Sequence, residues 1–129
     1  MNPSSSPDDV EIVDRISYLE VRYLGEFSVT RFNRQTDAAV QACSERGLFL
    51  LLIDLTGLNP IPTVIERFEA AIHGAKVAAE LSRVALVARP EFIDPGKFGV
   101  QVARNRGLNA EIFTDCRKAL EWLQASEKG

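Results

Sequence analysis

The stretch that decides the fold is LFLLLIDLTGLNPIPTVIER, which runs from Leu48 to Arg67. A run of aliphatic residues ends at Asp54, a segment of turn-forming residues follows, and a helical pattern begins near Pro62. This order predicts a buried strand, a loop and a helix, the unit from which α/β domains are built. Ligands and partners of open α/β sheets usually bind at the carboxyl ends of such strands, so the stretch also indicates where to look for a functional site.

The composition is that of one folded domain. The chain has 129 residues, and the 46% that are hydrophobic suffice for one core. The net charge is only -3 and both signs are spread along the chain, which argues against nucleic acid as a partner. The N-terminal segment is rich in Ser, Pro and Asp, so we predict a disordered tail over residues 1–9 and a single α/β domain over residues 10–129.

Three features favour a cytoplasmic protein. The N-terminus lacks the basic and apolar regions of a signal peptide, and the longest apolar run, Leu48 to Ile53, is too short to span a membrane. Cys43 and Cys116 show no disulfide-framework spacing, which favours a reduced compartment. We therefore expect no integral membrane association.

Working outward, helical periodicity appears on both sides of the buried strand at Leu48 to Leu55. Residues 10–27 alternate as in a strand or a bent hairpin near a sheet edge. A first helix is expected to begin after Ser28 as its N-cap and to end at Gly47. A second helix is expected from about Pro62 to Glu80. Its predicted buried stripe consists of Ile65, Phe68, Ile72, Ala75 and Ala79.

The C-terminal part continues the alternation of strands and helices. Arg83 to Ala88 and Ala110 to Phe113 are predicted strands. Asp94 and Pro95 predict the start of a helix that ends near Asn105, and Thr114 is the predicted cap of a last helix. The inward residues of that helix are expected to be Cys116, Ala119, Leu120 and Leu123. The fold class is therefore α/β, with a single-layer, mixed and mainly parallel sheet of four to five strands and about four helices.

Two segments resemble a known family. The segment IDLTGLNPI at residues 53–61 resembles the strand end of STAS domains, the fold of SpoIIAA-type anti-sigma-factor antagonists. The C-terminal pattern resembles that of stand-alone bacterial SpoIIAA-like proteins; its residues are Asn105, Arg106, Gly107, Ile112, Phe113, Asp115, Ala119, Trp122 and Leu123. The resemblance covers roughly residues 10–125. It implies a SpoIIAA/STAS-like sheet with helices mainly on one face, and regulation through protein–protein contacts in the anti-sigma branch.

The resemblance has one departure. Anti-sigma antagonists carry a phosphorylatable serine in a D-S-S-G turn, and Thr63 falls about where that serine would lie. The neighbouring Asp and Gly are absent, because Pro62 and Ile65 occupy their places. The pattern for phosphorylation switching is therefore incomplete.

Asp54 is the polar residue with the clearest alternatives. A carboxylate at a strand end could hold a cation or accept a phosphoryl group, or it could cap the loop by accepting backbone N–H bonds. We favour capping. A receiver domain needs further acidic and lysine residues that the chain lacks at the right places, and a haloacid-dehalogenase-type phosphatase needs a second Asp where Thr56 lies.

For the other residues that could bind or react, the sequence favours a surface or packing role over a functional one. Lys97, Arg104 and Arg106 could form an anion-binding edge, but a solvated helix face is favoured. His73 is expected on an exposed surface. Cys116 lies at a helix start, where a reactive thiol can arise, but a packed side chain is favoured. We expect no metal site, no cofactor and no catalytic constellation.

The favoured function is a non-catalytic regulatory or protein-interaction module. The working surface would be the loop that carries Asp54, Thr56, Asn59 and Thr63. The alternative is a carrier or sensor of a small apolar or amphipathic ligand. Its predicted ligand contacts are Val64, Ile65 and Phe68. An enzyme that uses Asp54 is least favoured, and self-association as a homodimer through the N-terminal strand edge is a further expectation.

Overall fold

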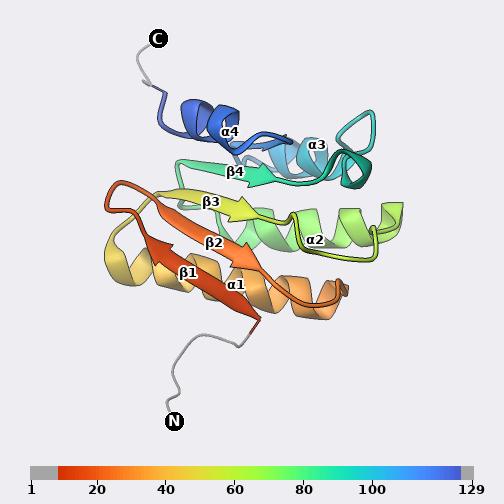
Figure 1. The fold of residues 1–129 in the computed structure, drawn as a ribbon, viewed down its shortest axis with the longest axis horizontal. Helices are drawn as coiled ribbons and strands as arrows, with labels where there is room; N and C mark the ends of the chain where they lie inside the picture. The colour runs from red at the N-terminus through yellow and green to blue at the C-terminus, as the bar shows by residue number, and fades with distance from the viewer. Residues whose placement is uncertain (1–8, 126–129) are drawn as a thin grey trace.

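The computed structural model describes residues 9–125 and contains a five-stranded sheet with four α-helices (Figure 1). The strands are β1 (Val10–Asp14), β2 (Leu19–Tyr23), β3 (Leu50–Asp54), β4 (Arg83–Val87) and β5 (Ala110–Phe113). The helices are α1 (Val29–Arg46), α2 (Val64–Val77), α3 (Phe98–Asn105) and α4 (Cys116–Leu123), with a short 3-10 helix η1 (Pro90–Phe92). The expected α/β class is confirmed. Of the disordered tail predicted over residues 1–9, residues 1–8 lie outside the described residues. Asp9 needs correction, because its carbonyl accepts hydrogen bonds from the Leu24 N–H and from Gln35 Nε2.

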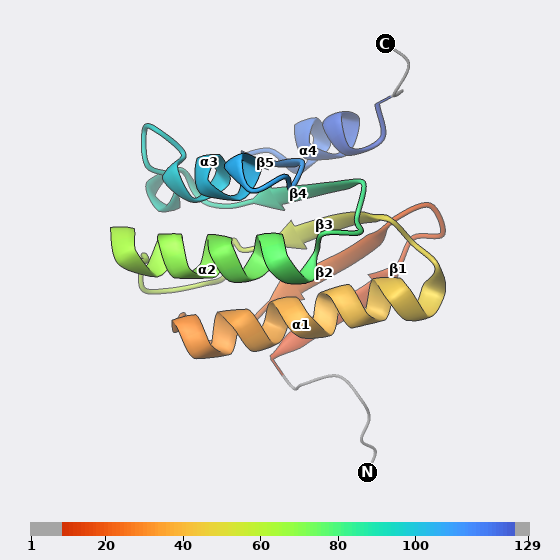
Figure 2. The same cartoon turned by 180° about the vertical axis from the view of Figure 1, so that it is seen from behind.

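The sheet order β1-β2-β3-β4-β5 determines where the helices lie. Strand β1 pairs antiparallel with β2, and every other neighbouring pair is parallel. Each crossover joins adjacent strands in the same direction across the sheet, so right-handed connections place α1, α2 and α3 on one face. Figure 2 shows these three helices in front of the sheet. Helix α4 follows the last strand and packs on the other face.

The two faces of the sheet bury different side chains. Leu19, Val21 and Leu51 point to the three-helix face and belong to the larger core cluster. The alternate residues of β3 and β4 meet α4, whose Ala119 and Leu123 are buried against Leu52, Ala85 and Val87. On β2, the side chains that face the α4 side of the sheet are Glu20 and Arg22, and α4 does not cover them.

Local capping signals locate the ends of α1 as expected. The Ser28 hydroxyl accepts a hydrogen bond from the Arg31 N–H, and Gly47 adopts φ 65° at the C-cap. A side chain at Gly47 would be strained because L residues rarely adopt this backbone conformation. The predicted hairpin over residues 10–27 is also confirmed as the antiparallel pair β1–β2.

The predicted starts of the last two helices need correction. Helix α3 begins at Phe98 rather than after Asp94, and its N-cap is Lys97 with φ 49°. Asp94 still caps from a distance, because its Oδ2 accepts the Phe98 N–H at 3.0 Å. Helix α4 is capped by Asp115, which is one residue beyond Thr114. Cys116 is exposed, not inward.

The predicted stripe of α2 is confirmed at Ala75, and Ile72 is half-buried, but its other three residues need correction. Ile65 and Phe68 are exposed and so is Ala79, whereas the buried residues at this helix are Ala75 and its C-cap Ala78. One reason is position, because the start of α2 extends beyond the carboxyl ends of the strands (Figure 1), so its bulky side chains have no strands beneath them.

Candidate functional site

Three loops meet at the carboxyl ends of the parallel strands. They follow β2, β3 and β4, and they lie with the start of α2 at the right-hand end of Figure 1. A β-bridge between Glu26 and Asn59 joins the first loop to the second. The predicted loop Asp54 to Thr63 is therefore part of a larger surface at this end of the sheet.

Asp54 is held by short contacts within its own loop and the neighbouring strand. Its Oδ1 accepts hydrogen bonds from the Thr56 N–H at 2.9 Å and from the Thr56 hydroxyl at 2.6 Å. Its Oδ2 accepts one from Arg22 Nε at 3.2 Å. This is the turn-capping role, in which both carboxylate oxygens are occupied by groups of the chain itself.

Arg89, two residues after the end of β4, fixes the same loop and was missed by the sequence reasoning. Its Nη2 donates to the Leu58 carbonyl at 2.6 Å and to Asn59 Oδ1 at 2.9 Å, and its Nε donates to the Thr56 carbonyl at 3.2 Å. Asn59 thus turns toward Arg89. A lone arginine after a strand carries no motif, so only its spatial neighbours reveal this role.

Thr63 is the N-cap of α2. Its hydroxyl accepts a hydrogen bond from the Glu66 N–H at 3.2 Å, and Glu66 Oε1 accepts one from the Thr63 N–H at 2.8 Å. This reciprocal pair is a capping box, which the Thr-x-x-Glu spacing could have predicted. The hydroxyl is exposed and lies at the end of the helix that attracts negative charge.

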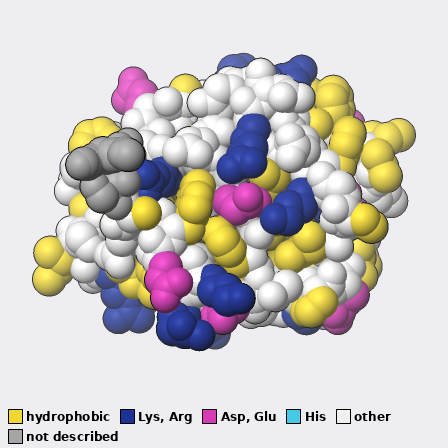
Figure 3. Space-filling view, turned by 90° about the horizontal axis from the view of Figure 1, so that it is seen from above, with side chains coloured by type: hydrophobic (Ala, Val, Ile, Leu, Met, Phe, Trp, Pro, Cys, Tyr) yellow, Lys and Arg dark blue, Asp and Glu magenta, His cyan; other side chains and the backbone are white. Residues whose placement is uncertain are grey.

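Exposed apolar side chains surround the start of α2. Val64 is 63% exposed, Ile65 69% and Phe68 39%, and Ile61 of the preceding loop is exposed as well. Figure 3 shows hydrophobic side chains gathered at its right-hand end, where these loops lie. Phe68 also stacks on Phe98 of α3, with ring centroids 6.5 Å apart. We call Ile61, Val64, Ile65 and Phe68 the apolar end cluster.

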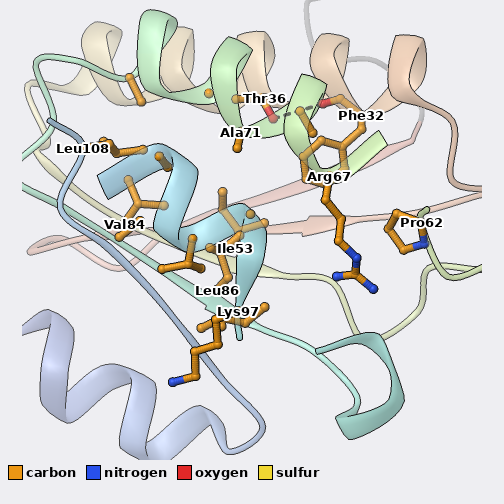
Figure 4. A pocket seen from close by; sticks show the side chains of 18 of the residues that line it. Phe32, Thr36, Ile53, Pro62, Arg67, Ala71, Val84, Leu86, Lys97 and Leu108 are labelled. Carbon is orange, nitrogen blue, oxygen red and sulfur yellow. Dashed lines mark hydrogen bonds between the residues drawn. The ribbon is translucent and has the colours of Figure 1, made fainter. Parts of the chain in front are cut away.

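An apolar cavity of about 140 Å³ lies between α1, α2, α3 and the sheet. Arg67 and Pro62 lie at one end of it, and Val84 and Leu108 at the other (Figure 4). Val64, Ile65 and Phe68 do not line it. The wall formed by α2 consists instead of small residues around the Arg67 stem, namely Ala70, Ala71, Gly74 and Ala78. We call this space the α2 cavity.

Four polar side chains reach the lining of the α2 cavity, and Arg67 is the one most relevant to binding. Thr36 is already bonded, because its hydroxyl contacts the Tyr23 hydroxyl at 2.9 Å and donates to the Phe32 carbonyl. The others are Arg67, Asp94 and Lys97. Sequence reasoning missed Arg67 because an arginine at a helical position normally indicates a solvated face.

The other residues considered in the sequence analysis either pair with carboxylates of the chain or are exposed without an activating environment. Lys97 Nζ and Arg104 Nη2 both pair with Glu111, at 3.3 and 3.7 Å. His73 is half-buried rather than fully exposed, because its Nε2 lies 2.6 Å from Asp37 Oδ1 of α1. Partial burial, followed by the charge of Glu20, raises the pKa of the Cys116 thiol, which is the opposite of activation.

Neither a protein-family model nor a curated protein matches the chain. Among residues 9–125, no cluster of three or more His, Cys, Asp or Glu side chains could hold a metal ion. No helix in that part of the chain is both long and apolar enough to cross a membrane.

Proposed function

We propose that this protein is a non-catalytic carrier or sensor of a small apolar or amphipathic ligand. The observation that carries the proposal is the α2 cavity, whose walls are apolar and whose charged groups gather near one end. Small-molecule sites commonly combine apolar walls with a few placed polar groups. At about 140 Å³ the cavity is close to the roughly 150 Å³ cavity that holds benzene in an engineered protein core.

The packing of α2 supports this proposal. Protein interiors are normally filled to the density of organic crystals, and voids cost stability. Helix α2 instead presents Ala71 and Gly74 to the space above Val84, and a Cβ added at Gly74 would meet no atom within 4 Å. A ligand would supply the missing contacts and stabilise the folded state in proportion to its occupancy.

The proposal is tested by filling the cavity from within. Native mass spectrometry of protein purified without denaturation reports any bound mass, and a benzene titration followed by amide NMR reports access to the cavity. We expect saturable shifts at Ala71, Gly74 and Val84. Gly74→Leu should abolish them and release any bound mass, because Gly74 lines the cavity and a Cβ added there meets open space.

Glu69→Leu is the matched control, because it adds the same side chain to the exposed side of the same helix. It should leave the benzene shifts and the bound mass unchanged. A wild-type protein that carries no mass and shows no saturable benzene shift would overturn the proposal.

A second candidate is a regulatory protein-interaction module, and the apolar end cluster favours it. Contiguous exposed apolar residues on a small protein commonly mark interaction sites, and this cluster adjoins the Thr63 cap. Cross-linking pull-downs from source extract should lose a defined partner on Ile65→Ser. They should keep it on Phe49→Ser, a comparably exposed residue elsewhere. Equal capture by all three proteins would contradict this candidate.

We also propose kinship with SpoIIAA-like proteins and a cytoplasmic location. The order of the sheet, its one antiparallel edge strand and the three helices on one face support the kinship. The non-catalytic role is supported by Asp54, whose two oxygens are engaged by Thr56 and Arg22. Strand β1 is a sheet edge that could pair with a second copy. Light scattering with Val13→Lys, a change on that strand, would test such a homodimer.

A further inference from the structure

Arg67 is a nearly buried cation at one end of the α2 cavity. Its side chain is only 13% exposed, and Figure 4 shows it reaching down from α2 beside Pro62. Its Nη1 donates to the Phe92 carbonyl at 2.8 Å and lies 3.5 Å from Asp94 Oδ1. The guanidinium carbon also lies 5.7 Å from the centre of the Phe92 ring. These contacts hold the guanidinium in one place.

One edge of this guanidinium remains available for a ligand. All its hydrogen bonds and ion pairs with residues 9–125 go through Nη1, so Nε and Nη2 have no acceptor there. Those two nitrogens present parallel N–H groups whose spacing matches the two oxygens of a carboxylate. Neither nitrogen is a fully buried atom, so water reaches both of them, and a ligand carboxylate would replace that water with charge-assisted hydrogen bonds.

The surrounding charges favour a ligand with one negative charge. Asp94 lies beside Arg67, and Glu111 pairs with both Lys97 and Arg104. Of the residues that line the cavity, Arg67 and Lys97 are cationic and Asp94 is anionic, which leaves one positive charge to be balanced. In Figure 4 the Lys97 ammonium points away from Arg67, so Arg67 alone would contact the ligand anion. A dianion such as a phosphate monoester would be repelled by Asp94 without a second cation to compensate.

We propose that the α2 cavity binds compact carboxylic acids in their anionic form. The carboxylate would sit on the Nε–Nη2 edge of Arg67, and an apolar group of about six carbon atoms would fill the space beneath Ala71 and Gly74, as benzene fills a cavity of similar size. The inference rests on the proposed function for the location of the ligand. It adds the chemical class of the ligand and the residue that selects it.

The test compares two probes of nearly equal size and shape, phenylacetate and 2-phenylethanol, by calorimetry or amide NMR at pH 7. The wild-type protein should bind phenylacetate at least about tenfold more tightly, because hydrogen bonds to charged groups are among the strongest in proteins. Arg67→Gln should remove this preference and leave 2-phenylethanol binding within about twofold. Arg67→Lys keeps the charge but loses the two parallel N–H donors, so most of the preference should also be lost.

Arg106→Gln is the charge-matched control, because Arg106 packs over the Phe68 ring and does not line the cavity. Its preference for phenylacetate should equal that of the wild type. Equal affinity of the wild type for both probes would overturn this inference and leave the proposed function standing, as would benzene binding without phenylacetate binding. If benzene, phenylacetate and 2-phenylethanol all fail to bind, both proposals fall. The wild-type comparison decides the matter even if an Arg67 variant does not fold.

Discussion

Helices α1 and α2 lie side by side on the same face of the sheet, but they contribute to the fold in opposite ways (Figure 2). Five residues of α1 are buried, whereas α2 buries only Ala75 between its ends. The large apolar residues of α2 face solvent near its start, and its small residues border the α2 cavity. The difference indicates that α1 is built for packing and that α2 leaves both a surface and a space free for binding.

The polar groups of α1 strengthen the contrast. Gln35 is buried, and its Nε2 donates to the Asp9 and Leu24 carbonyls, which ties α1 to both ends of the hairpin. The Thr36 hydroxyl meets the buried Tyr23 hydroxyl at 2.9 Å. Burial raises the pKa of that tyrosine well above its ordinary value, so the hydroxyl is neutral at pH 7.

The strongest way to break the comparison is to delete one phenylalanine from each helix. Phe32 of α1 contacts the rings of Tyr23 and Phe27, with centroids 5.1 and 5.6 Å apart. Phe32→Ala should lower the free energy of unfolding by about 3 kcal/mol. Phe68→Ala should cost less than about 1 kcal/mol, because that ring is partly exposed. Urea unfolding of both variants measures the difference, and equal losses would show that α2 is as tightly packed as α1.

A second test compares how fast a cysteine thiol on the inner side of each helix is alkylated. Cys43 of α1 is fully buried, and burial raises its pKa to about 11, so at pH 8 almost all of it is the unreactive thiol. The thiol introduced by Ala71→Cys would border the α2 cavity. In a Cys116→Ser background, iodoacetamide should modify that thiol on the order of a hundredfold faster than Cys43.

Mass spectrometry of the two modified peptides gives both rates from one sample. The sign of the pH effect is a further check. Because the folded-state pKa of Cys43 is raised, its thiolate fraction, and with it its modification rate, should climb as the pH rises toward 11. Rapid modification of Cys43 at pH 8 would mean that the core beneath α1 opens readily.

The elements that sequence reasoning located best are those with local signals. Ser28 and Gly47 delimit α1 because a side-chain cap and a left-handed backbone need only near neighbours. The alternation of strands and helices also predicted the α/β class and a mainly parallel sheet, although the order of the strands in the sheet comes from the structure. Three of the five stripe residues predicted for α2 are exposed, because periodicity shows which residues share a side of a helix but not how far the helix extends beyond the sheet. Tertiary contacts with α1 and α3 decide that placement.

In the candidate site, too, sequence reasoning found the residues with local signals and missed those set by tertiary contacts. The capping role of Asp54 was expected, since an aspartate at a strand end commonly accepts backbone N–H bonds. Arg67 and Arg89 were not identified, because their partners are 25 to 33 residues away in the sequence. The cavity itself has no sequence signal, since it is the volume left between three helices and the sheet.

A third test adds the same volume beneath each helix. Ala39 of α1 is fully buried, so Ala39→Leu overfills the core and should cost about 1–3 kcal/mol. Gly74→Leu places its side chain in the α2 cavity and replaces a glycine in a helix interior, so stability should stay equal or rise by up to about 1 kcal/mol. Thermal and urea unfolding give both values. A loss above about 1 kcal/mol for Gly74→Leu would show that the cavity closes in solution.

The smallest expected difference is in the stability lost when the N-cap side chain of each helix is removed. Ser28→Ala removes the acceptor of the Arg31 N–H, and Thr63→Ala removes that of the Glu66 N–H. Loss of such a cap costs about 0.5–2 kcal/mol. Because α1 is packed along its length, we expect about 1 kcal/mol for Ser28→Ala from urea unfolding.

For Thr63→Ala we expect about 0.5 kcal/mol, at the lower end of the range for cap removal. The first residues of α2 extend beyond the sheet, so Val64 to Glu66 can fray while Arg67 stays bonded to the Phe92 carbonyl. Amide hydrogen exchange should accordingly accelerate over residues 64–66 in Thr63→Ala and stay unchanged in Thr63→Ser, which keeps the hydroxyl. A larger loss for Thr63→Ala than for Ser28→Ala would mean that the start of α2 is an integral part of the fold. Its exposed apolar residues would then need an explanation other than binding.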